Sequence, residues 1–168
     1  MGDYEAAVAD YSKALQIDPR HFKAVYNKGY SEEKLGMYAE AVRDYTTALS
    51  IEPRNASAFH NRGSSLEKLG RLEDALRDYT QAIQLDPSNA SSYNSRGLVL
   101  DRSGRHQEAL ADLTTAIELD PGNAVYHHNK GFCYRNMNLF DKAVADYSRA
   151  ISLQPDDPNY LNNRGYAW

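Results

Sequence analysis

Residues 56–89 read ASAFHNRGSSLEKLGRLEDALRDYTQAIQLDPSN and form one complete structural unit of the chain. In the second half, apolar residues recur at three- and four-residue spacing, which is typical of one buried stripe on an α-helix. These residues are Leu72, Ala75, Leu76, Tyr79, Ala82 and Ile83. The first half carries Phe59, Gly63 and Leu66 on one helical face. We therefore predict one helix from about Ser57 to Leu69 and a second that ends near Leu85.

Glycine and proline mark the turns. A left-handed helix cap suits glycine and, next to it, asparagine, and the expected cap positions are Gly36, Gly70, Gly104 and Asn138. The second helix ends before Pro87, because a residue that precedes proline is disfavoured in the helical conformation. The mid-helix Gly63 is expected to permit close approach of the second helix, with Ala75 and Ala82 facing it.

The unit recurs every 34 residues along the whole chain. The prolines Pro19, Pro53, Pro87, Pro121 and Pro155 keep this step, as do the glycines Gly29, Gly63, Gly97, Gly131 and Gly165. The chain resembles the tetratricopeptide repeat family, whose pattern of aromatic, glycine, alanine, aromatic, alanine and proline is matched by Phe59, Gly63, Ala75, Tyr79, Ala82 and Pro87.

The resemblance implies an all-α fold, a right-handed α-solenoid of antiparallel helix pairs. We expect a single array over residues 1–168. It comprises the second helix of a truncated repeat (1–21), complete repeats at 22–55, 56–89, 90–123 and 124–157, and the first helix of a truncated repeat (158–168). Both ends fall within a unit, which is typical of a segment of a longer array.

Composition argues against several classes of partner. The net charge of −4 and the pI near 5.7 give no electrostatic reason to expect nucleic acid or an anionic membrane as partner. No apolar run approaches the ~20 residues of a membrane span. Cys133 is the single cysteine, so no internal disulfide can form, and we expect a cytoplasmic, reducing location.

Two charged series keep the 34-residue step. Cations precede each glycine at Lys28, Arg62, Arg96, Lys130 and Arg164, and carboxylates stand in the second helices at Asp10, Asp44, Asp78, Asp112 and Asp146. Five cations in register are compatible with a nucleic-acid track. The matched carboxylates favour a repeated ion pair between helices, with Arg62 joined to Asp44 or Asp78.

The position before each cation holds Asn27, Asn61, Ser95, Asn129 and Asn163. Asparagine forms helices poorly, and its amide can pair with main-chain groups of any sequence. The series is similar to the asparagine ladder of the tetratricopeptide superhelix attached to O-linked N-acetylglucosamine transferase, where the amides hold an extended polypeptide. The alternative is that these amides bond only to water or to neighbouring helices.

Helical spacing places further candidates on the same inner face: Tyr26, Tyr30, His60, Asn94, His128, Phe132 and Asn162. We predict a module that binds an extended peptide or partner segment in this groove. The alternatives are a rigid scaffold that assembles through its ends or convex face, and the substrate-recognition arm of a larger transferase.

Catalysis and metal binding find little support in the sequence. His127 and His128 point to different helix faces, and no histidine pair has the four-residue spacing of a helical metal site. Cys133 is interpreted as a small buried thiol. We therefore expect no enzyme activity, no cofactor and no metal.

The terminal helices are complementary halves of one unit. Apolar residues expected to be uncovered are Tyr160, Leu161 and Trp168 at one end and Val8, Tyr11, Ala14 and Leu15 at the other. We expect the end of one molecule to dock on the start of the next, which is head-to-tail self-association.

Overall fold

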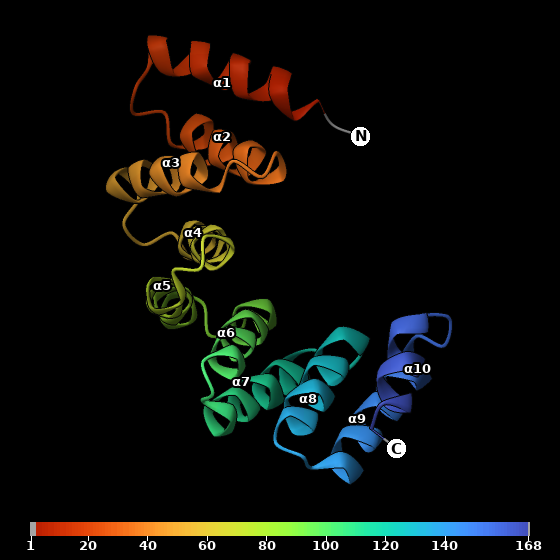
Figure 1. Ribbon diagram of the computed structural model, residues 1–168. Coiled ribbons are helices and arrows are strands. Elements are labelled where there is room, and N and C mark those ends of the chain that lie inside the picture. Colours follow the sequence, from red (N-terminus) through yellow and green to blue (C-terminus); the bar gives the residue numbers. More distant parts are fainter. Residues whose placement is uncertain (1–2, 168) are drawn as a thin grey trace. The chain divides into compact units, whose positions relative to one another are not determined.

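The computed structural model describes residues 3–167, which form helices joined by short turns and contain no strand (Figure 1). Two compact units, Met1–Pro87 and Ser88–Trp168, make up the chain. The first contains α1 (Tyr4–Ile17), α2 (Phe22–Lys34), α3 (Tyr38–Ile51), α4 (Ala56–Lys68) and α5 (Leu72–Leu85). The second contains α6 (Ala90–Arg102), α7 (His106–Leu119), α8 (Ala124–Asn136), α9 (Phe140–Leu153) and α10 (Pro158–Gly165). The predicted all-α class is confirmed.

Consecutive helices pack as pairs within each unit. The pairs are α2–α3 and α4–α5 in the first unit and α6–α7 and α8–α9 in the second, while α1 packs on α2 and α10 packs on α9. Each pair closes through the expected cap, with φ angles of 77° at Gly36, 74° at Gly70, 75° at Gly104 and 59° at Asn138. In α4–α5, the backbone N–H of Arg71 bonds to the carbonyl of Leu66 at 2.9 Å. The cap positions predicted from the sequence are confirmed.

The mid-helix glycines make room for a large side chain: the atoms nearest to Gly63 belong to Tyr79, and not to the predicted Ala75 or Ala82. A methyl group on Gly63 would lie 3.1 Å from the ring of Tyr79. Gly131 meets Tyr147 in the same way, and Gly97 meets Leu113. These glycines therefore let the second helix place a ring or a leucine flat against the first helix.

Small and aromatic side chains form the core of each unit. Tyr45, Tyr79 and Tyr147 are buried, with alanines packed around them: Ala41, Ala48, Ala75, Ala82, Ala143 and Ala150. Among residues 3–167, no helix has both the length and the apolar character needed to cross a membrane.

The terminal helices are more covered than expected. The apolar residues of α1 that were expected to be uncovered are half-buried, because α1 packs on α2: Val8, Tyr11, Ala14 and Leu15. Tyr160 was expected to be uncovered, but it is buried in a cluster with Ala124 and Ala150 because α10 packs on the preceding pair. Leu161 is 48% exposed, as expected. Trp168 lies outside the described residues.

Candidate functional site

The candidate residues lie on the first helix of each pair. Within the first unit, α2 and α4 contact each other, and within the second, α6 and α8 do. Asn27, Tyr26 and Tyr30 stand on α2, and Asn61 and His60 on α4. The second unit carries Asn94 on α6, His128, Asn129 and Phe132 on α8, and Asn162 and Asn163 on α10. The first helices alone therefore supply this surface.

The ladder asparagines link neighbouring first helices. Asn61 donates from Nδ2 to the Tyr26 hydroxyl at 2.8 Å, and Asn129 donates to Oδ1 of Asn94 at 2.8 Å. Asn163 Nδ2 lies 2.7 Å from Nε2 of His128. Each partner stands 35 residues earlier in the chain, a spacing that the sequence analysis did not consider. Bonds to neighbouring helices, which the sequence analysis gave as an alternative use of these amides, are therefore present at Asn61, Asn129 and Asn163.

The links leave part of each amide available. An amide group has two N–H donors and one oxygen acceptor, so a bond through Nδ2 uses one of the two donors. In Asn129 the oxygen Oδ1 also lies 3.3 Å from Nδ1 of His128. Asn61, Asn129 and Asn163 are half-buried, which keeps an edge of each amide at the surface. The bond to the preceding first helix also restricts the rotation of the side chain.

Aromatic rings support the same surface. Tyr26 stacks on Phe22 with ring centroids 5.8 Å apart, and His60 lies 5.4 Å from the ring of Tyr79. His128 lies 5.0 Å from Tyr160. Burial lowers the pKa of His60 and of His128, so both imidazoles are neutral at neutral pH.

Two aromatic rings, the exposed Tyr30 and the half-buried Phe132, carry a cation. Lys34 Nζ lies 4.8 Å from the centroid of the Tyr30 ring, and the Arg135 guanidinium lies 4.5 Å from the Phe132 ring. Tyr30 itself is 40% exposed. Contacts of this kind hold the ring faces and the charges together at the surface.

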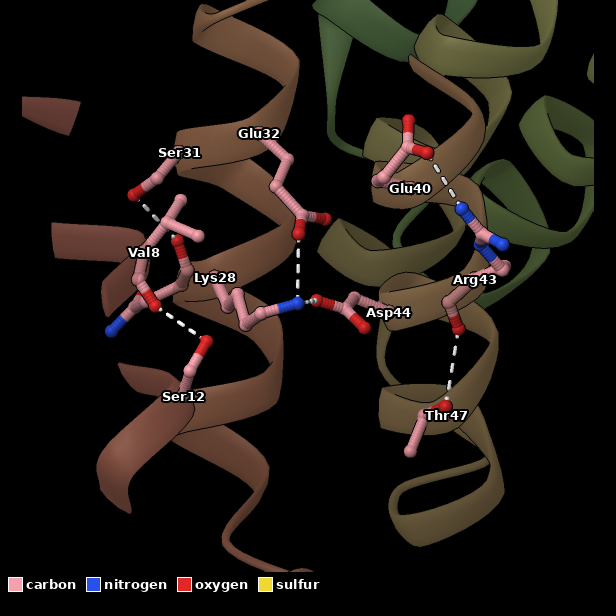
Figure 2. Close-up of polar contacts among 10 residues, drawn as sticks. Val8, Ser12, Lys28, Ser31, Glu32, Glu40, Arg43, Asp44 and Thr47 are labelled. Atoms are coloured by element: carbon pink, nitrogen blue, oxygen red, sulfur yellow. Dashed lines mark hydrogen bonds and ion pairs between the residues drawn. The ribbon is translucent and has the colours of Figure 1, made fainter. Parts of the chain in front are cut away.

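The charged columns form ion pairs inside the helix pairs. Arg62 bonds to Asp78 through Nε at 2.7 Å and Nη2 at 2.8 Å, and Arg96 bonds to Asp112 at the same two distances. Lys28 bonds to Asp44 at 2.6 Å and to Glu32 at 2.7 Å, and Figure 2 shows its ammonium between the two carboxylates. The predicted ion pairs are confirmed for Lys28, Arg62 and Arg96, and of the two candidates for Arg62 the partner is Asp78. Lys130 Nζ lies 3.8 Å from Asp146, whereas Arg164 bonds to Ser148 and Asp10 pairs with Lys13 of its own helix.

Two arginines of the cation series, Arg62 and Arg96, are each held by a mostly buried carboxylate. The side chains of Arg62 and Asp78 are only 20% and 8% exposed, and those of Arg96 and Asp112 are 22% and 9% exposed. A phosphate would have to displace a bidentate carboxylate from each arginine. The geometry therefore favours the structural role of these cations over a nucleic-acid track.

Cys133 is buried in α8, as interpreted from the sequence. Burial, reinforced by the Asp101 carboxylate, raises the pKa of its thiol to about 12. A nucleophilic cysteine needs the opposite shift. The histidine next to it in space is His106, whose backbone carbonyl accepts from the thiol at 3.7 Å, and not one of the two histidines considered in the sequence.

Comparison with known proteins relates the whole chain to one family. Tetratricopeptide repeat profiles match residues 1–36, 29–70, 60–124 and 124–157. No curated protein matches the sequence.

Solved structures share the fold. The crystal structure of YrrB, a TPR protein with an unusual peptide-binding site, has a TM-score of 0.83 and 30% identity over 97% of this chain and 84% of that one. MamA gives a TM-score of 0.86 with 25% identity over 92% and 90%. TTC0263, a thermophilic TPR protein of Thermus thermophilus, gives 0.80 with 25% identity over 98% and 90%. The family profiles match from residue 1 to residue 157, and the described residues form ten helices, as in these structural relatives. The chain therefore belongs to the tetratricopeptide repeat family.

Proposed function

We propose that this chain is a non-enzymatic binding module that holds an extended peptide along its first helices. The row of ladder asparagines carries the proposal, because the amides of Asn61, Asn129 and Asn163 are oriented by a bond to the preceding first helix and keep an edge at the surface. Fixed amide groups can pair with the backbone of a peptide whatever its side chains. Preorientation lowers the entropy that such a contact costs.

The surrounding groups fit an uncharged backbone ligand. The imidazoles of His60 and His128 are neutral, and two arginines of the cation series are paired with carboxylates. Tyr30 and Phe132 add ring faces beside Lys34 and Arg135. The likeness to YrrB, described as having a peptide-binding site, supports the same class of ligand. We place the module in the reducing cytoplasm, on the single buried thiol, and keep the repeat division predicted from the sequence.

Selection of phage-displayed random peptides provides the test. A peptide recovered on the wild-type chain is then titrated by fluorescence polarisation against Asn27→Ala and Asn129→Ala. We expect each variant to weaken binding by about 1–3 kcal/mol, as for interface hydrogen bonds that leave a buried group unpaired. Alanine substitutions along the peptide should matter less than N-methylation of its backbone. If the wild type, Asn27→Ala and Asn129→Ala bind the peptide with equal affinity, the ladder asparagines are not part of the binding site.

End-to-end association is a second proposal, favoured by two charged residues. Arg164 bonds to Ser148 at 3.1 Å, whereas Arg62 and Arg96 each hold a carboxylate. Asp10, which occupies the carboxylate column in α1, is 76% exposed and pairs with Lys13 of its own helix. A docked copy would bring Asp10 to Arg164 and cover Leu161. Light scattering over a hundredfold range of concentration should show growing mass, and a constant monomer mass contradicts this proposal.

A further inference from the structure

In one cluster of side chains of the second unit, several residues differ from those at the equivalent positions of the other repeats. Asp101 stands where the other repeats have Glu33, Glu67 and Arg135, and His106 stands where they have Tyr38, Leu72 and Phe140. Cys133 replaces Ser31, Ser65 and Val99, and Asn136 replaces Lys34, Lys68 and Arg102. Leu113 replaces Tyr45, Tyr79 and Tyr147. Five departures at one place indicate a local requirement that the fold itself does not impose.

The structure brings these residues together between α6–α7 and α8–α9. His106 Nδ1 lies 2.7 Å from Asp101 Oδ1, and Asn136 donates to Asp101 Oδ2 at 2.7 Å. The candidate ligand atoms of Asp101, His106 and Cys133 all lie within 4.8 Å of one another. Asp101 is 5% exposed and Cys133 is fully buried. In the first unit the corresponding carboxylates of Glu33 and Glu67 accept from tyrosine hydroxyls instead.

We propose that Asp101, His106 and Cys133 bind a Zn²⁺ ion, with water as the fourth ligand. Sulfur, imidazole nitrogen and carboxylate oxygen are the donors that Zn²⁺ takes in proteins, at ~2.3 Å for sulfur and ~2.0–2.2 Å for the other two. Tetrahedral coordination at those lengths puts the ligand atoms about 3.3–3.7 Å apart. The contact between His106 and Asp101 must therefore open from 2.7 Å, and any separation near the upper limit of 4.8 Å must shorten by roughly 1 Å.

Charge and outer contacts fit the ion. On binding, the thiol of Cys133 loses its proton to solvent. The imidazole, whose Nδ1–H faces the Asp101 carboxylate without the metal, changes tautomer through solvent, so that its proton lies on Nε2 and Nδ1 binds the metal. A thiolate and a carboxylate then neutralise the two positive charges, which a buried site requires. Asn136 holds the second oxygen of Asp101, an outer-shell contact of the kind that orients metal ligands.

An open path leads to the cluster. A surface cavity of about 250 Å³ is lined by His106 and its neighbours Gly104, Arg105, Gln107 and Glu108, together with Met137. His106 is the most exposed of the three ligands, at 31% of its side chain. The ion would therefore enter past the imidazole, and the water ligand would face the cavity.

The test uses the wild-type chain with Co²⁺ and Zn²⁺ as probes. Co²⁺ should produce a thiolate-to-metal charge-transfer band with one-to-one stoichiometry, and Zn²⁺ should abolish the band. Zn²⁺ should also raise the melting temperature in proportion to the logarithm of its concentration above Kd. Absence of the charge-transfer band in the wild-type chain overturns the proposal without any variant.

The repeat itself supplies matched variants. Cys133→Val and His106→Leu install the residues of the equivalent positions Val99 and Leu72. Each should weaken Zn²⁺ binding at least about 100-fold, because even outer-shell losses cost ~10–100-fold. His21→Asn, which installs the helix cap found at Asn55, is the control and should bind Zn²⁺ as the wild type does. Unchanged Zn²⁺ affinity in Cys133→Val would overturn the site, and peptide affinity should be the same in all three variants.

Discussion

The helix pairs α4–α5 and α6–α7 share one polar contact and differ in another. Both hold a bidentate arginine–carboxylate pair with the same distances, Arg62 with Asp78 and Arg96 with Asp112. The acid at the end of the first helix differs. Glu67 accepts from the hydroxyl of Tyr79, whereas Asp101 contacts His106 and Asn136 and its pair has Leu113 at the position of that tyrosine. The arginine–carboxylate contact is thus the same in both pairs, and the contact of the acid varies.

The largest effect is expected from the shared contact. Arg62→Ala and Arg96→Ala should each lower the free energy of unfolding by about 2–3 kcal/mol, since removal of one partner leaves a mostly buried carboxylate unpaired. The two losses should be equal, because geometry and burial match. Urea denaturation of both variants measures them. A nucleic-acid role predicts instead little change in stability and a salt-dependent loss of RNA binding.

The second comparison concerns the acid at the end of the first helix, and it is tested by giving α6–α7 the residues of α4–α5. Leu113→Tyr should lower the free energy of unfolding by about 1–3 kcal/mol through overpacking, because the ring is larger than the leucine side chain. The Asp101 carboxylate already bonds to His106 and Asn136, so it is not free to accept from the new hydroxyl. Adding Asp101→Glu restores the acid of the first unit and should recover part of the loss, a coupling of about 0.5–1 kcal/mol. A double-mutant cycle by urea denaturation measures the coupling. Strict additivity would mean that the acid and the ring positions act independently.

Much of the fold was predictable because the repeat presents the same evidence several times. The predicted helix from about Ser57 to Leu69 corresponds to α4 (Ala56–Lys68), and Leu85 ends α5 as expected. The left-handed caps were predictable from Gly and Asn alone, because few other residues adopt that conformation. The pairing of Arg62 with a carboxylate could be predicted because a cation series and a carboxylate series both recur every 34 residues.

The contacts between repeats were harder to foresee. A bond from Asn61 to Tyr26 depends on how far one first helix is rotated against the next, and residue spacing within one unit does not determine that angle. Tyr79, and not an alanine, faces Gly63 because a ring can lie flat over the missing side chain. The cluster at Cys133 was missed since each residue was considered within its own helix, although the departures from the columns were visible in the sequence.

A residue that differs from those at the equivalent positions of other repeats can also lower stability, and we expect this of Glu32. It is buried where the equivalent positions have Leu66 and Leu100, and its Oε2 has no partner in the described chain. Glu32→Leu should raise the free energy of unfolding by about 1 kcal/mol at neutral pH, because a buried ion pair is often less stable than an apolar replacement. Lys28 keeps Asp44 as its partner.

The gain from Glu32→Leu should depend on pH. Burial raises the pKa of Glu32 above its ordinary value of 4.5, so the folded wild type carries a penalty for the ionised form. That penalty is absent below pH 4.5 and develops as the pH rises through the folded-state pKa. The difference in stability between variant and wild type should therefore grow from pH 4 to pH 7. A difference that is flat across this range contradicts the assignment of the cost to the carboxylate.

The smallest effect compares two members of the ladder. Asn61→Ala should destabilise by about 1 kcal/mol, the usual net contribution of one hydrogen bond, because the bond to Tyr26 is lost. In the described part of the chain, the Asn27 side chain makes no such bond, so Asn27→Ala should change stability by less than about 0.5 kcal/mol. Urea denaturation of both variants measures this difference.

Peptide titration of the same two variants separates folding from recognition. If the ladder binds the peptide backbone, both variants should lose affinity although only Asn61→Ala loses stability. Tyr26→Phe is the control for the link, because it removes the acceptor of Asn61 and retains the amide. Loss of affinity in Tyr26→Phe with folding intact would show that orientation of the amide matters to binding. If Asn27→Ala binds the peptide with full affinity and only Asn61→Ala loses affinity, the asparagines link the repeats and do not bind the peptide backbone.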